Sequence, residues 1–354
     1  MNSGLRIAIT ADPYLPVPPT LYGGIERVLD FLVRGLADRG HQVTLFAHPD
    51  SLVPAALVPY GCPPHFTRLD RVRELWQVGA RLWAKRNEFD LIHSFGRLAA
   101  LTPVLTLRGL PKIQSYQRCG VPWKSIGIAS RLARRSIRFT ACSSSLYRES
   151  ACGTWHTVFN GVDLGKYTFQ REVASDAPLV FLGRLEPIKG AHNAIAIARS
   201  AGRRLVIAGN QVPSSMEYFE SQIAPHIDGD RVRYLGPVDD KAKDALLSSA
   251  AALLMPIEWE EPFGIVMAES LACGTPVIGF ARGSVTEVVR DGVNGYRCHG
   301  NADAVSAVDK LGSLDRSLVR KDCERRFSST VIVQAYERLY RDLCAETRAA
   351  GGVI

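Results

Sequence analysis

Two glutamates in the segment EWEEPFGIVMAESLACGTPVIGF (258–280) have a spacing that suits a ligand clamp. Residues 265–272 favour a helix, so Glu261 would lie just before that helix and Glu269 about two turns into it. Eight helical residues rise about 12 Å, which is comparable to an extended sugar diphosphate with its ribose. One carboxylate would then hold sugar hydroxyls and the other ribose hydroxyls, although two solvated acids would give the same pattern.

The turn between these glutamates favours the clamp. Gly264 permits close approach of a ligand, and the N–H groups of Phe263, Gly264 and Ile265 would face phosphates at the helix N-terminus. Glu258 and Glu260 lack this spacing, so they are weaker candidates.

Two cations follow an apolar run in LGRLEPIKG (182–190). Arg184 would lie at the carboxyl end of a strand, and Lys189 would open the next helix together with Gly190. A planar guanidinium, a point charge and free helix N–H groups together suit a diphosphate. The alternative is a pair of ordinary solvated bases.

A glycine pair stands at the start of the first long helix, in LYGGIERV (21–28). Gly23 and Gly24 permit close backbone approach to a phosphate or sugar, or they form a plain tight turn.

Strand and helix patterns alternate along the whole chain and must position these residues. Short apolar runs read as buried parallel strands, and longer amphipathic runs between them read as helices. A polar stretch, 165–178, interrupts the alternation and would link two α/β domains. We therefore expect two doubly wound Rossmann-like domains that face a central cleft, with ligands at the carboxyl ends of the strands. Strands are predicted at 5–10, 41–47, 89–95, 139–143, 154–163, 179–185, 204–210, 232–238, 251–256 and 275–280.

Composition limits the function classes. The 354 residues are 46% hydrophobic and 22% charged, and no apolar run is long enough for a membrane-spanning helix. Residues 1–165 contain 20 Lys and Arg against 11 Asp and Glu, so the whole positive excess of the chain lies there. That half has either an anionic partner or a solvated basic face. The start lacks signal-peptide features and no C-x-x-C pair occurs, so we expect a cytoplasmic protein without a bound metal.

The motifs EPFGIVMAESLACGTPVIGF, GRLEPIKG, NGVD and LYGGIERV together resemble those of family-four glycosyltransferases. The resemblance covers nearly the whole chain and implies the twin-Rossmann glycosyltransferase B fold. It implies an acceptor-binding domain at 1–165, a donor-binding domain at 166–328, and a closing helix at about 329–348 that crosses back onto the first domain.

The resemblance also implies an activity: metal-independent transfer of a hexose, with retention of configuration, from a UDP-, GDP- or ADP-sugar. That sugar nucleotide is a co-substrate, and no other cofactor and no nucleic acid are expected. Carried onto this sequence, Arg184 and Lys189 would neutralise the leaving diphosphate, Glu261 would hold the sugar, and Glu269 would hold the ribose. Gly24 would approach the diphosphate from the other domain. The base would be lined by residues near Gly209, Asn210 and Leu235.

One departure concerns the acceptor side. Family members often carry a histidine after the strand that here reads PKIQSYQRCG, where this chain has Tyr116 and Gln117. Both can hydrogen-bond a sugar, but neither is a ready acid or base near neutral pH. His93 ends another strand and either faces the cleft or is a structural histidine.

Two further segments have two interpretations each. DGD (228–230) matches a metal-binding pattern of the other main glycosyltransferase fold but reads better as a turn. The basic segment 125–139 reads as a helix, which either is an ordinary surface helix or rests on the inner face of a membrane near an anionic or lipid-linked acceptor.

Two other functions remain open at this point. A nucleotide-sugar 2-epimerase would share the twin-Rossmann fold, and the missing histidine would suit a non-catalytic sugar-nucleotide binding protein.

Overall fold

Two compact units make up the chain in the computed structural model, which describes residues 4–19, 23–61, 67–147 and 152–351. Unit 1 comprises Met1–Asn160 and Ser329–Ile354, and unit 2 comprises Gly161–Ser328. The segment predicted as a linker, 165–178, belongs to unit 2. There the Thr168 N–H donates to Asp244 at 2.7 Å, and the Gln170 N–H donates to the Cys273 carbonyl at 3.1 Å.

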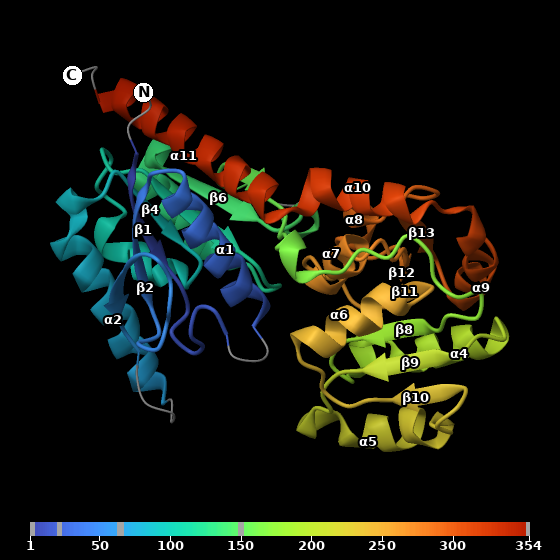
Figure 1. Cartoon of the computed structure of the whole chain (residues 1–354). Helices are drawn as coiled ribbons and strands as arrows, with labels where there is room; N and C mark the ends of the chain where they lie inside the picture. The colour runs from blue at the N-terminus through green and yellow to red at the C-terminus, as the bar shows by residue number, and fades with distance from the viewer. Residues whose placement is uncertain (1–3, 20–22, 62–66, 148–151, 352–354) are drawn as a thin grey trace. The chain divides into compact units, whose positions relative to one another are not determined.

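Unit 1 is built on a seven-stranded parallel sheet in the order β3-β2-β1-β4-β5-β6-β7 (Figure 1). Its central strands are buried apolar runs, as a sheet covered on both faces requires. The strands are β1 (Arg6–Thr10), β2 (Gln42–Ala47), β3 (Ala56–Pro59), β4 (Leu91–Ser94), β5 (Lys112–Tyr116), β6 (Ile137–Ala141) and β7 (Trp155–Thr157).

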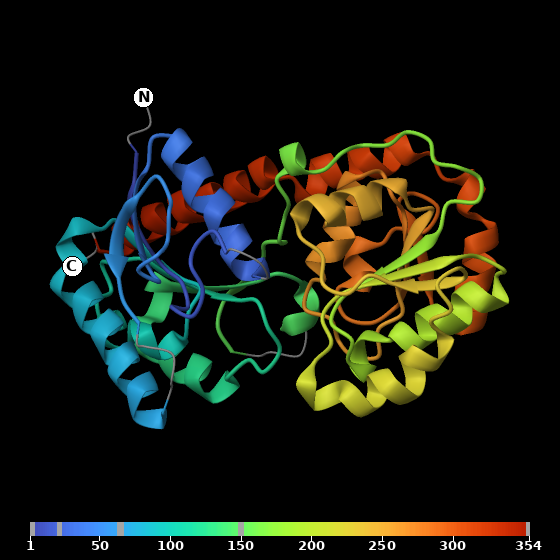
Figure 2. The same cartoon turned by 60° about the horizontal axis from the view of Figure 1, so that its bottom comes forward.

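Helices cover both faces of this sheet. α1 (Gly24–Asp38) and α11 (Ser329–Gly351) pack side by side, as Figures 1 and 2 show. α2 (Arg68–Ala84) and α3 (Trp123–Ala133) share one apolar cluster with the 3-10 segment η2 (Leu98–Val104). α2 begins with a capping box in which Thr67 and Asp70 satisfy each other's backbone N–H groups.

Unit 2 repeats the plan with a six-stranded parallel sheet in the order β10-β9-β8-β11-β12-β13. The prediction of two doubly wound α/β domains is therefore confirmed. The strands are β8 (Leu179–Leu182), β9 (Leu205–Ala208), β10 (Val232–Tyr234), β11 (Ala252–Met255), β12 (Val277–Phe280) and β13 (Gly295–Cys298). The helices are α4 (Ala191–Ser200), α5 (Met216–Tyr218), α6 (Asp240–Ser249), α7 (Ile265–Ala272), α8 (Val285–Val288), α9 (Asn301–Asp309) and α10 (Arg316–Phe327). Short 3-10 or π segments include η5 (Leu164–Lys166), η6 (Pro187–Lys189) and η8 (Phe219–Ile223).

The basic segment 125–139 is not one helix. α3 ends at Ala133, Arg134 has φ 52°, and a short 3-10 turn leads into β6 at Ile137. The change occurs because 137–141 supplies a buried strand that pairs with β5, and a continuous helix would remove that strand from the sheet. Along the described part of the chain, no helix combines the length and apolar character needed to cross a bilayer.

Candidate functional site

Lys189 is positioned by close backbone packing. The segment after β8 forms η6 and then Gly190, whose φ of 75° favours glycine. A Cβ at Gly190 would lie 1.9 Å from the Pro256 carbonyl oxygen, and the Glu258 N–H donates to the Ile188 carbonyl at 2.8 Å. The segment therefore docks on the chain leaving β11 and brings Lys189 to Glu261.

Glu261 lies at the centre of the first charged cluster. Its Oε2 is 2.6 Å from Lys189 Nζ and accepts a 2.9 Å hydrogen bond from Trp259 Nε1. Lys189 Nζ also lies 4.5 Å from the centroid of the Trp259 ring. The two charged side chains are only 16% and 9% exposed, so the pair is held with little solvent.

Glu269 has a similar pair of neighbours. Its Oε1 is 2.6 Å from Lys243 Nζ on α6 and accepts a 2.7 Å hydrogen bond from the Tyr167 hydroxyl. Lys243 and Glu269 are 12% and 7% exposed, and Lys243 Nζ lies 5.8 Å from the Tyr167 ring centroid. Each of the two predicted clamp carboxylates is thus matched by one lysine and one aromatic side chain.

The start of α7 lies between these clusters in the sequence. Gly264 is the N-cap in a left-handed conformation with φ 67°, and α7 begins at Ile265 without a side-chain cap. A Cβ at Gly264 would lie 3.0 Å from the terminal methyl groups of Met255 and Met267, so glycine fits this packed turn. Phe263 is buried against Phe327, so its side chain belongs to the core.

The other acids of the quoted segment have separate structural partners. Glu258 Oε1 accepts from Asn193 Nδ2 at 2.8 Å, and Glu260 Oε2 accepts from the Gly283 N–H at 2.6 Å. Both glutamates therefore hold neighbouring backbone and side chains, and their weaker candidacy stays a prediction.

Arg184 is not joined to Lys189 by a contact in the structure. Its guanidinium forms a 3.0 Å ion pair with Glu186 and is 44% exposed. Lys189 is paired with Glu261 and lies directly before Gly190, the N-cap of α4, which starts at Ala191. The shared anion site of Arg184 and Lys189 stays a prediction.

The residues predicted around the base lie at the carboxyl ends of β9 and β10. Leu235 is 44% exposed, and Asn210 is exposed beyond the end of β9. Packing inside unit 2 requires glycine at position 209, because a Cβ there would lie 1.8 Å from the Gly183 carbonyl oxygen. The Gly209 carbonyl accepts a 2.9 Å hydrogen bond from Tyr234.

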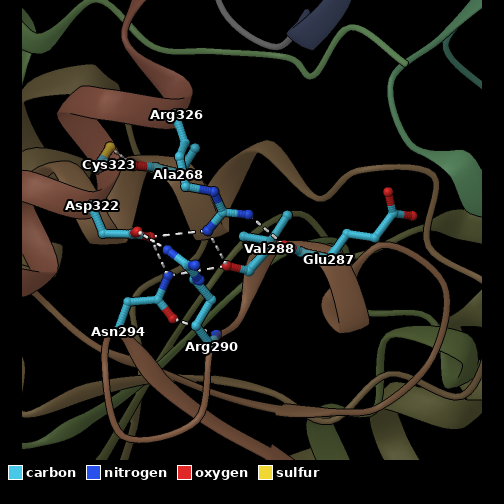
Figure 3. A network of polar contacts seen from close by, with 8 residues as sticks. All are labelled: Ala268, Glu287, Val288, Arg290, Asn294, Asp322, Cys323 and Arg326. Carbon is cyan, nitrogen blue, oxygen red and sulfur yellow. Dashed lines mark hydrogen bonds and ion pairs between the residues drawn. The ribbon is translucent and has the colours of Figure 1, made fainter. Parts of the chain in front are cut away.

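A buried polar network lies beside α7 and includes residues of α10 (Figure 3). Asp322 on α10 is fully buried and accepts from Asn294 at 2.8 Å, Arg326 at 2.9 Å and Arg290 at 3.0 Å. The adjacent Cys323 thiol donates to the Ala268 carbonyl of α7 at 3.4 Å. This network joins α10 and the segment before β13, and α10 in turn packs on the helix that carries Glu269.

In unit 1, His93 is a core residue. It is fully buried, with Nδ1 2.6 Å from the Tyr340 hydroxyl and Nε2 2.7 Å from the Ser115 hydroxyl. Burial lowers the pKa of His93 to about 3, so the ring is neutral. This placement corrects its assignment to the acceptor side, because the ring contacts α11 instead of solvent.

Tyr116 and Gln117 carry buried polar atoms at the carboxyl end of β5. The Tyr116 hydroxyl and both amide atoms of Gln117 have no hydrogen-bond partner among the described residues. Burial also raises the pKa of Tyr116. Buried polar atoms without protein partners usually meet water or a ligand.

The glycine pair opens α1. Gly23 is the N-cap and Gly24 the first helical residue, whereas residues 20–22 lie outside the described part. A Cβ at Gly23 would lie 2.7 Å from Pro19 and 2.8 Å from Glu26 Oε2, so the position has no room for a larger residue.

Sequence reasoning missed four charged residues near the carboxyl ends of β1, β4 and β5. Burial raises the pKa of Asp12, whereas Arg118 and Arg97 lower it. Burial likewise raises the pKa of Glu26, which interacts with both Arg118 and Asp12. Three of these residues could have been found from their positions in the sequence. Asp12, Arg97 and Arg118 each follow a buried strand, as Arg184 does.

Two α/β units, each with a parallel sheet, are the architecture of glycosyltransferases of the B fold. A model described as Glycosyltransferase Family 4 matches residues 22–166, and one described as Glycosyl transferases group 1 matches residues 169–324. The chain belongs to the family-four glycosyltransferases, as its relation to a glycogen synthase from Mycobacterium tuberculosis (strain H37Rv) also shows. The two are 32% identical, and the match covers 83% of this chain and 82% of that one.

Solved structures show the same fold. A glycosyltransferase involved in avilamycin A biosynthesis is similar with a TM-score of 0.72 and 25% identity, over 96% of this chain and 98% of that one. HepE from Anabaena, in complex with UDP-glucose, has a TM-score of 0.70 and 19% identity, over 98% of this chain and 100% of that one.

Proposed function

We propose that this protein is a retaining, metal-independent glycosyltransferase that moves a hexose from a nucleotide-diphosphate sugar to an acceptor hydroxyl. The observation that carries the proposal is the arrangement around α7. Two buried carboxylates, each with a lysine partner, lie before and within a helix that begins without a side-chain cap. The UDP-glucose bound by the structural neighbour HepE supports a nucleotide sugar as donor.

Each charged residue has a distinct role in the proposal. Glu261 holds hexose hydroxyls, Glu269 holds the ribose, and Lys189 and Arg184 bind the diphosphate. During transfer, the bond between the anomeric carbon and the phosphate oxygen breaks, and its electron pair stays on the diphosphate. The acceptor oxygen bonds to the anomeric carbon, and its proton passes to the departing diphosphate oxygen. Fixed cations and the N–H groups at the start of α7 stabilise the charge that develops on the leaving group.

The carboxyl ends of the strands in unit 1 supply the acceptor side in this proposal. The unpartnered amide of Gln117 and hydroxyl of Tyr116 suit sugar hydroxyls. Arg97 and Arg118 favour an acceptor that carries negative charge.

The test is a panel of UDP-, GDP- and ADP-sugars. Thermal shift identifies the donor, because a ligand that binds only the folded state raises the melting temperature. Released nucleoside diphosphate, undiminished by EDTA, and a product whose anomeric configuration by NMR equals that of the donor are expected. An altered sugar on an intact diphosphate would indicate an epimerase, and binding without turnover would indicate a binding protein.

Variants connect the activity to the site. Lys189→Ala and Glu261→Ala should each lower turnover by orders of magnitude while circular dichroism stays unchanged. Glu258→Ala is the matched control, because Glu258 contacts Asn193 outside the cluster. Near-wild-type rates in both Lys189→Ala and Glu261→Ala would exclude the assignment of the donor site.

A further inference from the structure

The outer side of α2 in unit 1 is apolar, which is unusual for a helix that already buries its inner side. Val78 and Leu82 face the core, being 1% and 0% exposed. On the solvent side Leu69, Val72 and Trp76 are 80%, 65% and 72% exposed. These positions follow i, i+3 and i+7, so they form one stripe along the helix.

α3 has a similar outer side. Ile128 is 59% exposed and Leu132 is 42% exposed, whereas Ile126 and Ala129 are buried in the core. α2 and α3 pack on the same face of the sheet, because residues of both belong to one apolar cluster with η2. Their outer sides therefore point away from the same face of unit 1. We call Leu69, Val72, Trp76, Ile128 and Leu132 the apolar stripe.

Positive charge accompanies the apolar stripe. From Leu91 to Arg148 the sequence contains ten Lys and Arg residues and no Asp or Glu. On α3 and the turn after it, Lys124, Arg131 and Arg135 are exposed near Ile128. On α2, Arg73 is exposed beside Trp76, and beyond the helix Arg86 lies 4.6 Å from the Trp83 ring centroid.

We propose that this face of unit 1, the apolar stripe with its surrounding cations, binds the surface of an anionic phospholipid bilayer. Exposed Trp, Leu and Ile side chains enter the boundary between headgroups and acyl chains, while Lys and Arg meet the lipid phosphates. The charge pattern selects this partner, because the exposed cations Arg73, Lys124, Arg131 and Arg135 accompany the apolar stripe on both helices and attract an anionic surface. Lys112 of the same stretch is buried, and Arg138 pairs with Glu346, so neither contributes. The proposed surface includes α2 in addition to the basic segment on α3. The sequence alone did not show that the outer side of α2 is apolar.

This inference goes beyond the proposed transferase activity and is tested without any sugar nucleotide. Full-length protein is floated through a density gradient with vesicles of phosphatidylcholine alone or with 30 mol% phosphatidylglycerol. The protein should float with the anionic vesicles and stay behind with the neutral ones. Raising the salt should weaken binding, since ions screen exposed charges.

Two double variants probe the two components separately. Each cation near an anionic bilayer strengthens binding about fivefold, so Arg131→Glu with Arg135→Glu should lower partitioning by about twenty-five-fold or more. Val72→Asn with Trp76→Asn should lower it by about tenfold or more, because apolar area no longer enters the bilayer.

Matched controls come from unit 2. Lys310→Glu with Lys321→Glu changes the same charge at exposed positions, and Leu318→Asn removes an exposed leucine of 50% exposure. These controls should float like the wild type, and all variants should keep the wild-type melting temperature within a few degrees.

Three results would overturn the proposal. They are absence of flotation with anionic vesicles, unchanged flotation of both double variants, and equal losses in the unit 2 controls. Sedimentation without vesicles adds a fourth: a dimer that Val72→Asn with Trp76→Asn dissociates would assign this face to contact between two copies of the chain. None of these results bears on released nucleoside diphosphate, so failure here is distinguishable from failure of the proposed function.

Discussion

Replacing Glu261 with glutamine should have opposite effects on nucleoside diphosphate binding and on sugar transfer. The Glu261 carboxylate lies 2.6 Å from Lys189 Nζ. A diphosphate that binds Lys189 must therefore approach a negative charge that is already there. Glu261→Gln keeps the shape of the side chain but removes this charge, so a nucleoside diphosphate without a sugar should bind more tightly. Transfer should collapse, because the carboxylate proposed to hold the hexose is gone.

The magnitude follows from the geometry of the pair. A phosphate oxygen about 2.8 Å from the lysine amine would lie about 5 Å from the carboxylate. Two unit charges at that separation repel by about 2–3 kcal/mol at an effective dielectric constant of about 20 to 40. Removing the carboxylate should thus tighten diphosphate binding by about thirty- to a hundred-and-fifty-fold. Lys189→Met loses a charged hydrogen bond of about 1.5–3 kcal/mol and should weaken binding by about ten- to a hundredfold.

Isothermal titration calorimetry with the nucleoside diphosphate of the best donor measures both changes. Glu258→Gln is the control, since it makes the same chemical change three residues away, at a side chain that contacts Asn193. Its affinity should equal that of the wild type. If Glu261→Gln instead weakens diphosphate binding as much as Lys189→Met does, Glu261 orients the lysine for the ligand and the competition argument fails.

Three further predictions concern stability and the pH dependence. Asp322→Asn should lower the free energy of unfolding of unit 2 by about 3 kcal/mol, because the buried carboxylate accepts hydrogen bonds from three donors. Urea titrations measure this loss. A loss below about 1 kcal/mol would contradict a stabilising role for the network in Figure 3. Burial raises the pKa of Glu337, but hydrogen bonds from Arg341, Arg39 and His41 outweigh burial and lower it to about 2, so stability present above pH 4.5 should be lost towards pH 2. Between pH 4.5 and pH 2 the free energy of unfolding of the wild type should fall by about 2–3 kcal/mol more than that of Glu337→Gln, after allowance for solvent around the arginines. If the free energies of unfolding of the two proteins change in parallel with pH, this prediction is wrong. His93→Gln should lower stability by about 1–3 kcal/mol and leave the pH profile of kcat/KM unchanged between pH 5 and 8, because the pKa of His93 is about 3.

The sequence predicted the fold class because buried parallel strands leave continuous apolar runs. It missed strands that lack such a run. β3 (ALVP) is an edge strand without a buried residue, and β13 (GYRC) has a buried residue only at each end. The end of α3 was missed for another reason: helical periodicity continues through RLARRS, and only the backbone at Arg134, with φ 52°, shows the turn.

The site was only partly predictable, because its pairs join distant segments. Glu261 and Lys189 were each identified, but their contact depends on how Gly190 docks against Pro256, which no local pattern reveals. Lys243 and Tyr167 were not identified at all. One comes from an ordinary amphipathic helix, and the other from a polar stretch that resembled a linker.

Charge compensation in the proposed donor site limits how a sugar nucleotide can bind. Glu261 is matched by Lys189, Glu269 by Lys243, and Arg184 by Glu186, so these six side chains sum to no net charge. A diphosphate adds at least two negative charges and needs favourable partners that are not already used. The N–H groups at the start of α7 supply some. The exposed Arg184 supplies another, since it can leave Glu186 at little cost because surface ion pairs are weak.

Lys189 is different, since its partner is nearly buried. It is more available to the diphosphate when sugar hydroxyls replace it as hydrogen-bond donors to Glu261. The sugar and the diphosphate should therefore bind cooperatively, and the intact nucleotide sugar should bind more tightly than its nucleoside diphosphate in the wild type but not in Glu261→Gln.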